Sequence, residues 1–365
     1  MPEHPFVLYV DRAWRKDPAV ARHIPLMVPW WGNPFTGHLP FMRELFNHYS
    51  FDTTLYRVTD DPGERADMVL MPYNHHVLLT RFPEMLEQGI AEARRRKVLL
   101  LVDSAIDINY DAPPDSVILR YGGYRFLQKP NEMYLPLYAD DLLERYCGGA
   151  LELRDKSSTP TVSFVGWTHL PLLQEVRAVA KDIPQRMLGI VSARRRSMRK
   201  GIFLRRKALK LLEASTAVRA HIVRRKSYSG YLDREEDEIQ QVRKEFVDTL
   251  LNSDYALDVR GDTNGSMRLF EALSLGRIPV IVDTARPLPL SHTLDYRQFS
   301  VLVDIRELSH LPERIAAFHA SLSPEVFKGM QVKAREAFKN YFRVDALTKH
   351  LVEELRAQVN TFSRK

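Results

Sequence analysis

The residues best suited to binding a charged ligand lie within residues 254–284, DYALDVRGDTNGSMRLFEALSLGRIPVIVDT. The spacing of apolar residues predicts a strand, a polar loop, a helix, a turn and a second strand. Because the loop RGDTNGS joins a strand to a helix, the unpaired N–H groups and the positive end of that helix would face a bound anion. Arg260 and Arg268 flank the loop, and Gly261 and Gly265 let the backbone approach a ligand closely. Guanidinium groups pair with phosphate oxygens, so the segment predicts a diphosphate site.

Glu271 extends this site by one helical turn beyond Arg268. Its carboxylate could accept two hydrogen bonds from the diol of a ribose. An alternative stays open, in which Arg268 and Glu271 form an exposed ion pair and Asn264 or Ser266 only caps the helix. The loop has neither the Gly-Lys-Ser/Thr ending of phosphate-loop NTPases nor the G-x-G-x-x-G pattern, so neither of those nucleotide sites is predicted.

Together with LPLSHTLDYRQFSVLVD at residues 288–304, this segment resembles the hallmark of exostosin-type glycosyltransferases. That pattern has an Arg-Gly loop, Ser-x-Arg, an acidic residue, Gly-x-Ile-Pro-Val-Ile and a later Asp-Tyr/Trp-x-x-Phe-Ser-Val. The matching residues are Arg260, Gly261, Ser266, Arg268, Glu271, Gly276, Ile278, Pro279, Val280, Ile281, Asp295, Tyr296, Phe299, Ser300 and Val301. The resemblance covers most of the second half of the chain and only patches of the first, such as DDPGERADMVLMPYNHH at residues 60–76.

This resemblance implies an α/β fold of the GT-B type, with two Rossmann-like domains facing a central cleft. It places the acceptor mostly on the first domain and the nucleotide sugar on the second. The implied donor-binding residues are Arg260, Gly261, Asn264, Gly265, Ser266, Arg268 and Glu271. The resemblance also implies inverting transfer from a nucleoside-diphosphate sugar, usually UDP-linked, without an obligatory metal. We therefore expect no cofactor, with the nucleotide sugar as a co-substrate.

Inverting transfer needs a base that takes the proton of the acceptor hydroxyl as the diphosphate leaves. The candidates are, in order, Asp103 at the end of VLLLVD, His38 at the start of a predicted helix, and His75 after a predicted strand. Asp103 could instead cap the following turn, and His75 and His76 could form a surface pair. A metal site is not predicted, because Cys147 is the only cysteine and no His-x-x-x-His spacing occurs.

Short aliphatic runs alternate with segments of helical period along the chain, which is typical of α/β domains with parallel sheets. We predict strands at residues 6–10, 67–71, 98–102, 161–166, 255–259, 278–282 and 300–303, and helices at 39–49, 82–96 and 324–359. The polar stretch CGGALELRDKSSTP marks a domain boundary. We predict an acceptor-side domain at 1–150, a nucleotide-sugar domain at 151–340, and a C-terminal helix at 341–365 that packs back toward the first domain.

The composition is that of an ordinary globular protein, with 365 residues, 45% hydrophobic and 27% charged, and a net charge of +7. It excludes disordered, collagen-like and disulfide-rich proteins. No apolar run approaches the roughly 20 residues that a membrane span needs. The first residues also lack the basic start and the cleavage site of a signal peptide. These features predict a cytoplasmic protein.

Residues 194–225, which begin at Arg194 and end at Arg225, form a strongly basic stretch whose one acid is Glu213. Large apolar side chains such as Ile202 and Leu209 lie among the bases. One interpretation is a helix that lies peripherally on an anionic membrane surface, where a lipid-linked acceptor would be met. The other is that the apolar residues belong to the core of the second domain and the bases face water. No nucleic-acid partner is expected, because the overall charge is too mild.

The sequence thus predicts an exostosin-like hexosyl- or pentosyltransferase that moves a sugar from a UDP-linked donor to a glycan or lipid-linked glycan. The lack of a predicted membrane anchor, the single cysteine and the basic stretch depart from animal and plant relatives, and they indicate a bacterial enzyme of surface polysaccharide synthesis. Two alternatives stay open. One is a nucleotide-sugar epimerase of the same fold, and the other is a non-catalytic protein that binds anionic glycan or nucleic acid.

Overall fold

The computed structural model describes residues 4–35, 40–104, 110–168, 176, 200–225, 236–261 and 263–364. The chain divides into two compact units. The first unit comprises Met1–Gly122, Gln128–Tyr138 and Asn340–Lys365, and the second comprises Gly123–Leu127 and Ala139–Lys339. This long part of the second unit begins at Ala139, before the polar stretch in which the sequence predicts the boundary, and Leu142 and Leu143 are buried among its apolar residues.

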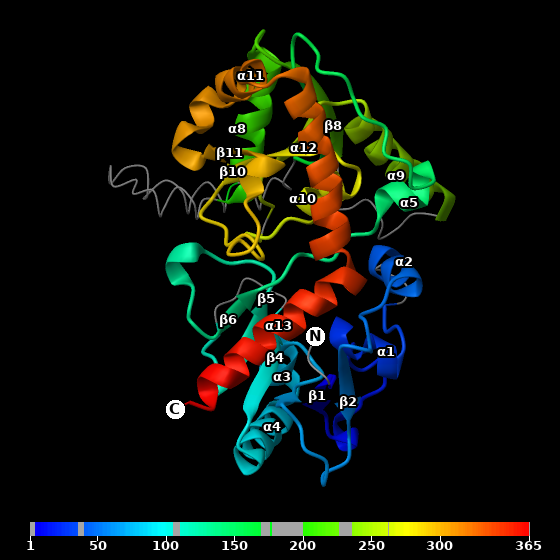
Figure 1. Ribbon diagram of the computed structural model, residues 1–365, viewed down its shortest axis with the longest axis vertical. Coiled ribbons are helices and arrows are strands. Elements are labelled where there is room, and N and C mark those ends of the chain that lie inside the picture. The colour runs from blue at the N-terminus through cyan, green and yellow to red at the C-terminus, as the bar shows by residue number, and fades with distance from the viewer. Residues whose placement is uncertain are drawn as a thin grey trace. The chain divides into compact units, whose positions relative to one another are not determined.

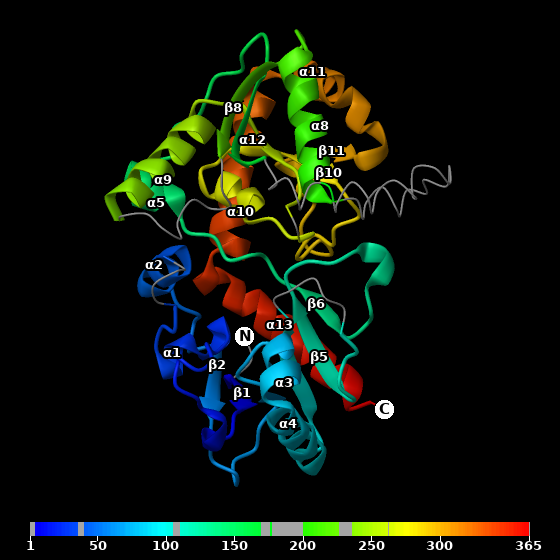
Figure 2. The same cartoon turned by 180° about the vertical axis from the view of Figure 1, so that it is seen from behind.

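The first unit is built on a six-stranded parallel sheet in the order β2-β1-β3-β4-β5-β6 (Figure 1). Its strands are β1 (Phe6–Tyr9), β2 (Tyr56–Thr59), β3 (Met68–Leu70), β4 (Leu99–Ser104), β5 (Ser116–Arg120) and β6 (Glu132–Tyr134). Its helices are α1 (Val28–Trp31), α2 (Pro40–His48), α3 (His75–Arg81), α4 (Pro83–Arg96) and α13 (Val344–Phe362). Helix α13 crosses in front of this sheet in Figure 1 and behind it in Figure 2, where α3 lies in front. Strands β3, β4 and β5 are buried along their whole length, as expected of a sheet covered on both faces.

The second unit is built on a five-stranded parallel sheet in the order β11-β10-β9-β7-β8. Its strands are β7 (Thr161–Trp167), β8 (Arg219–Arg225), β9 (Tyr255–Asp258), β10 (Ile278–Asp283) and β11 (Val301–Asp304). Its helices are α5 (Leu142–Cys147), α8 (Gly201–Ala214), α9 (Glu236–Leu251), α10 (Met267–Ser274), α11 (Leu311–Ser321) and α12 (Pro324–Ala337). Helix α12 lies in front of the sheet in Figure 1 and α8 in Figure 2, so helices cover both faces. The predicted α/β fold class with two Rossmann-like domains is confirmed.

The β9–α10–β10 segment follows the predicted strand, loop, helix and strand closely. Four consecutive residues of α10, Leu269, Phe270, Glu271 and Ala272, are buried, which fixes the helix against the sheet. The turn after α10 contains Gly276 at φ +64°, and a β-carbon there would lie 2.4 Å from the side chain of Leu151. Only glycine accommodates both the left-handed backbone and this close packing. The turn therefore fixes the path of the chain from the end of α10 to the start of β10.

Four strands are absent from the sequence-based prediction: β2, β5, β6 and β8. Of these, β2, β6 and β8 are edge strands, which are short or polar and lack a continuous aliphatic run. The segment 324–359, predicted as strongly helical, is helical except at Arg343, and the π-helix Phe338–Phe342 separates α12 from α13. Both Phe338 and Phe342 are buried, so packing interrupts the helix where no glycine or proline does. Among the described residues, no helix is both long and apolar enough to cross a bilayer.

Candidate functional site

The predicted donor loop, residues 259–266, follows the carboxyl end of β9 in the second unit. In the order β8-β7-β9-β10-β11, the chain moves from the first strand β7 to one side and then returns to the other. The carboxyl ends of β7 and β9 therefore flank the point where the strand order reverses. In open α/β sheets, ligands bind in the crevice at this reversal. The loop lies at the position where the fold itself favours a ligand.

Asp258, the last residue of β9, holds the donor loop through hydrogen bonds to its carboxylate. Its Oδ1 accepts a hydrogen bond from the Ser266 hydroxyl, and its Oδ2 accepts one from Arg286 Nη2 at 2.5 Å. Burial raises the pKa of Asp258. The guanidinium of Arg286 and the Ser266 hydroxyl lower the pKa by more than burial raises it, so the net shift is downward. The carboxylate is therefore charged at neutral pH and pairs with a buried arginine.

This network determines what Ser266 does at the start of α10. Ser266 is the N-cap residue, yet its side chain makes no capping hydrogen bond. Its hydroxyl is directed to Asp258 instead. The interpretation of Ser266 as a simple helix cap is therefore wrong. The first N–H groups of α10 receive no side-chain cap from this residue, which leaves the positive end of the helix suited to an anion.

Arg268 lies in the first turn of α10 and points back to the end of β7. Its Nη2 donates to the carbonyl oxygen of Val165 at 3.0 Å, and its guanidinium carbon lies 4.5 Å from the centre of the Phe164 ring. Gly166 makes room for it, because a β-carbon there would lie 2.7 Å from Arg268 Nη2. Unlike the nearly buried arginines around it, Arg268 is partly exposed. It is therefore oriented across the reversal between β7 and β9.

Glu271 does not pair with Arg268. Its Oε1 lies 2.7 Å from Nη1 of Arg243, a residue of α9, and both side chains are nearly buried. The interpretation of an exposed pair between Arg268 and Glu271 is therefore wrong. The proposed contact from Glu271 to a ribose stays a prediction, and the carboxylate would make it while neutralising Arg243.

Arg260 and Asn264 contact a segment that lies far from them in the sequence. Arg260 Nη1 donates to the hydroxyl of Tyr124, and the side chain of Arg260 is only 5% exposed. Asn264 donates to the carbonyl oxygens of Gly123 at 2.7 Å and Thr284 at 3.1 Å, and its Oδ1 accepts a hydrogen bond from the Thr284 hydroxyl. The amide of Asn264 thus ties the loop to the end of β10.

The predicted glycines lie where the loop is packed most tightly. Gly265 is buried, and a β-carbon on Gly261 would lie 3.2 Å from Arg205 Nη2. The closest approach comes from Gly201, the first residue of α8, where a β-carbon would lie 1.9 Å from the carbonyl oxygen of Gly261. The start of α8 therefore supports the donor loop directly.

Sequence reasoning missed two arginines of this site, Arg205 and Arg286. Arg205, on α8, donates to the carbonyl oxygen of Trp167 at 2.9 Å at the end of β7. Arg286 follows the end of β10 and pairs with Asp258. The signal for Arg286 was its place just after a predicted strand, because the carboxyl ends of parallel strands share one edge of the sheet. Arg205 gave no separate signal within its basic surroundings.

In the first unit, Asp103 lies near the carboxyl end of β4 and is buried. Its Oδ2 accepts a hydrogen bond from the Tyr121 hydroxyl at 2.6 Å, and its Oδ1 accepts one from the Asn74 amide at 3.2 Å. Burial raises the pKa of Asp103 to about 6, although these hydrogen bonds oppose the shift. A carboxyl group with such a pKa can exchange a proton near neutral pH.

His75 begins α3, directly after the Asn74 that contacts Asp103. It is 2% exposed, so the interpretation of His75 as part of a surface pair is wrong. Its Nε2 is buried and has no hydrogen-bond partner among the described residues. Burial, and then the charge of Arg120, lower the pKa of His75. The ring is therefore neutral at pH 7, while the third predicted base, His38, lies outside the described residues.

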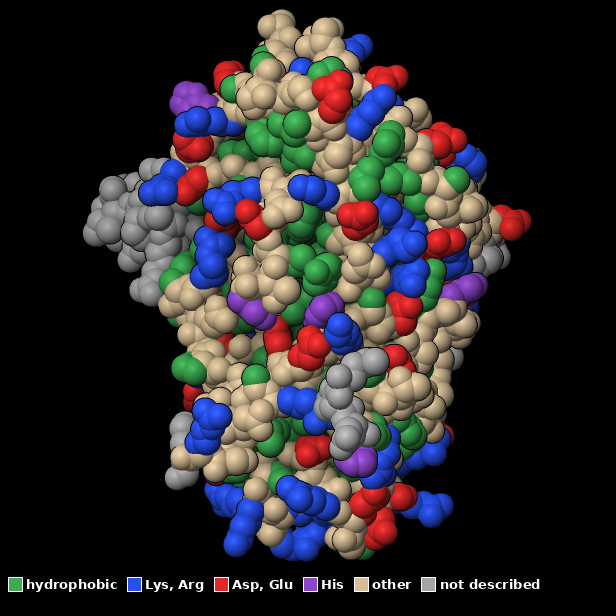
Figure 3. Space-filling view, viewed as in Figure 1, with side chains coloured by type: hydrophobic (Ala, Val, Ile, Leu, Met, Phe, Trp, Pro, Cys, Tyr) green, Lys and Arg blue, Asp and Glu red, His purple; other side chains and the backbone are tan. Residues whose placement is uncertain are grey.

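The basic stretch is described only from residue 200 onward, so Arg194 lies outside the described part. Apolar residues of α8, including Ile202, Leu204, Leu209 and Leu212, are buried within the second unit. Of the bases, Arg224 pairs with Glu213 and Arg225 with Glu245. Acidic and basic side chains are also interspersed over the face drawn in Figure 3. For the described part, the apolar residues therefore belong to the core, as the second interpretation had it.

No group of three or more histidine, cysteine, aspartate or glutamate side chains in the described ranges is arranged to hold a metal ion.

Residues 154–318 match the model of the Exostosin GT47 domain. An exostosin-1 homolog of Caenorhabditis elegans is 30% identical over 120 residues, which are 33% of this chain and 30% of that protein. Exostosin-1 of Drosophila melanogaster is 34% identical over 86 residues, 24% of this chain and 11% of that protein. The chain thus matches less than a third of the length of these relatives.

Solved structures are more distant. A glycosyltransferase from Rickettsia africae is 11% identical, with a TM-score of 0.42 over 98% of this chain and 99% of that one. The family-model match lies within the second unit and includes the donor loop with its hallmark residues. Over residues 154–318, the chain is thus similar to the Exostosin GT47 domain.

Proposed function

We propose that this protein is an inverting glycosyltransferase that moves a sugar from a UDP-linked donor to a hydroxyl of a glycan or lipid-linked glycan. The observation that carries the proposal is the donor loop at the reversal between β7 and β9. There, the start of α10 has no side-chain cap from Ser266 and Arg268 points across the strand ends. Synthesis of a bacterial surface polysaccharide is the setting that we propose for this activity.

The chemistry follows from where charge develops. As the bond between the sugar and the diphosphate breaks, negative charge grows on the leaving phosphate oxygens. Arg268 and the N–H groups at the start of α10 would stabilise this charge, and they are fixed before the reaction begins. Since these groups supply the positive charge that a divalent ion would otherwise bring, we propose that transfer needs no metal.

Asp103 is the proposed base, ahead of His38, which lies outside the described residues, and His75. A carboxylate whose pKa lies near 6 is mostly ionised at pH 7 and can accept the proton of an acceptor hydroxyl. The Tyr121 and Asn74 hydrogen bonds fix its orientation. The two sites lie in different units, and each is tested by its own variant.

The first experiment is a thermal-shift screen against a panel of UDP-sugars, because a ligand that binds only the native state raises the melting temperature. With the donor thus found, UDP release is measured in the presence of glycan acceptors. Arg268→Ala should lose about 2 to 4 kcal/mol of transition-state stabilisation. The matched control is Arg306→Ala, an exposed arginine of the same unit that pairs with Asp304.

Melting temperatures are recorded for both variants, because Arg268 also packs on Phe164. Full turnover by a folded Arg268→Ala variant would exclude the assignment. Interconversion of the donor without UDP release would identify an epimerase instead. Excess chelator should leave the rate unchanged, and a loss of activity restored by manganese would contradict metal independence.

A further inference from the structure

The segment Gly123–Leu127 leaves the first sheet between β5 and β6 and belongs to the second unit. It is attached to the donor loop and to the end of β10 by polar contacts. Asn264 donates to the carbonyl oxygen of Gly123, and the backbone N–H of Arg125 donates to Ala285 at 2.8 Å. The guanidinium of Arg125 pairs with Asp283 at 2.7 Å. The segment therefore forms one wall of the candidate donor site.

Within this wall, Tyr124 covers Arg260. Its hydroxyl accepts a hydrogen bond from Arg260 Nη1, and its ring centre lies 5.4 Å from the guanidinium carbon. Phe126, two residues further along the segment, stacks on Tyr124, with 5.2 Å between the centres of the two rings. Arg260 is thereby buried although it lies in the loop that would bind a diphosphate. An anion that accepts a hydrogen bond from this Nη1 must take the place of the Tyr124 hydroxyl.

We propose that Tyr124 is a further residue of the donor site, which competes with a phosphate oxygen of the donor for the guanidinium of Arg260. This inference rests on the proposed function. A phenol oxygen and a phosphate oxygen accept the same N–H group, but the charged phosphate makes the stronger hydrogen bond. The donor therefore displaces Tyr124, and the free energy of breaking the tyrosine contact is subtracted from the donor's affinity.

The segment Gly123–Leu127 is weakly packed. None of its five residues is buried, and Leu127 is exposed. The Arg125–Asp283 pair is partly exposed, and ion pairs that are exposed to water contribute little to stability. Regions with few buried apolar contacts open more readily than the rest of a fold. Displacement of Tyr124 therefore exposes no buried side chain of the segment.

The test measures the affinity for UDP by titration calorimetry in wild type, Tyr124→Phe and Tyr124→Ala. Tyr124→Phe removes the hydroxyl and keeps the ring, so we expect UDP to bind roughly three- to tenfold more tightly, the equivalent of one hydrogen bond. Tyr124→Ala should bind at least as tightly as Tyr124→Phe. Pyrophosphate should show the same gain and uridine none, because the competition concerns phosphate oxygens.

The matched control is Tyr255→Phe, which removes a tyrosine hydroxyl at the opposite, amino-terminal end of β9, where it contacts His319. This control should leave the UDP affinity unchanged. Loss of folding alone cannot produce tighter binding, so a gain confined to the Tyr124 variants supports the inference. Unchanged or weaker UDP binding in both Tyr124 variants overturns it. If the wild-type protein binds no UDP, the proposed function fails, and the inference fails with it.

Discussion

The side chain of Asp103 shows how the fold can tune a single carboxyl group. Burial is the main influence and raises its pKa from 3.8 to about 6, whereas the hydrogen bonds from Tyr121 and Asn74 lower it. Folding therefore favours the protonated form. The stability that this preference contributes is fully present below pH 4 and is lost as the pH rises through about 6. At pH 8 the protein retains a buried carboxylate at a cost in stability.

Replacement of Asp103 by asparagine tests this argument. Asp103→Asn should melt at a higher temperature than the wild type at pH 8, by the equivalent of at most about 3 kcal/mol, and at nearly the same temperature at pH 4. Scanning calorimetry at the two pH values measures the difference, with the exposed Asp60→Asn as control. If Asp103 is the base, the wild-type rate should also rise through pH 6, and the variant should lose activity. A stability difference that does not depend on pH would contradict the role of burial.

At the scale of elements, the donor loop depends on the start of α8. Gly201 is the first residue of that helix, and its missing side chain lets the helix contact the loop backbone. A β-carbon on Gly201 would lie 1.9 Å from the carbonyl oxygen of Gly261 and 2.5 Å from that of Arg260. Neither backbone atom can give way without moving the loop.

Gly201→Ala should therefore lower the melting temperature and raise the KM for the donor. The matched control is Gly329→Ala, within α12, where a β-carbon meets nothing within 4 Å. Alanine at that helical position should stabilise the protein by about 0.5 to 1 kcal/mol. Thermal unfolding and donor titration of the two variants measure both effects. A Gly201→Ala variant as stable and as active as the wild type would show that the loop does not depend on α8.

The strands and the site residues also show which features could be predicted from the sequence. Aliphatic runs predicted β1, β3, β4, β7, β9, β10 and β11, because buried strands of parallel sheets are continuously apolar. Edge strands such as β8 meet solvent and carry no such signal. Arg260 and Arg268 were predicted from a pattern within one segment. Tyr124 and Arg205 join them only through tertiary contacts, for which a single sequence offers no periodicity to read.

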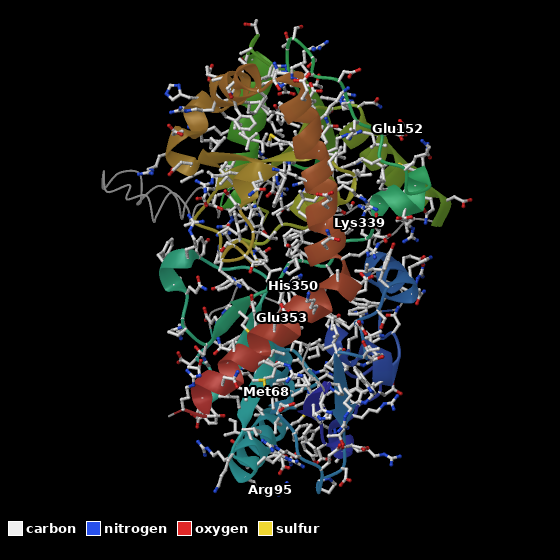
Figure 4. The ribbon with its side chains drawn as sticks, in the orientation of Figure 1. Met68, Arg95, Glu152, Lys339, His350 and Glu353 are labelled. Carbon is white, nitrogen blue, oxygen red and sulfur yellow. The ribbon has the colours of Figure 1, made fainter. Side chains whose placement is uncertain are left out.

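At the scale of the whole molecule, the first unit is completed by the last helix of the chain. Buried side chains recur along one face of α13 at Val344, Leu347, Leu351 and Leu355 and belong to the same core as β1, β3, β4 and β5. His350 and Glu353, labelled in Figure 4, belong to the more polar part of this helix. The distance between His350 Nδ1 and Glu353 Oε2 is 3.6 Å. The amphipathic pattern explains why α13 packs on a sheet formed more than 200 residues earlier in the chain.

Stability of the first unit should therefore depend on α13, while nucleotide binding should depend on the second unit. Leu351→Ala removes a buried side chain, and such changes cost about 2 to 5 kcal/mol because the cavity fills only partly. We expect a lower melting temperature but an unchanged UDP affinity when binding is measured well below the transition. Leu302→Ala on β11, where the leucine is 43% exposed, is the control and should change neither quantity much. If Leu351→Ala weakened UDP binding as strongly as it lowered the melting temperature, the two units would not be energetically separate, and the prediction would be wrong.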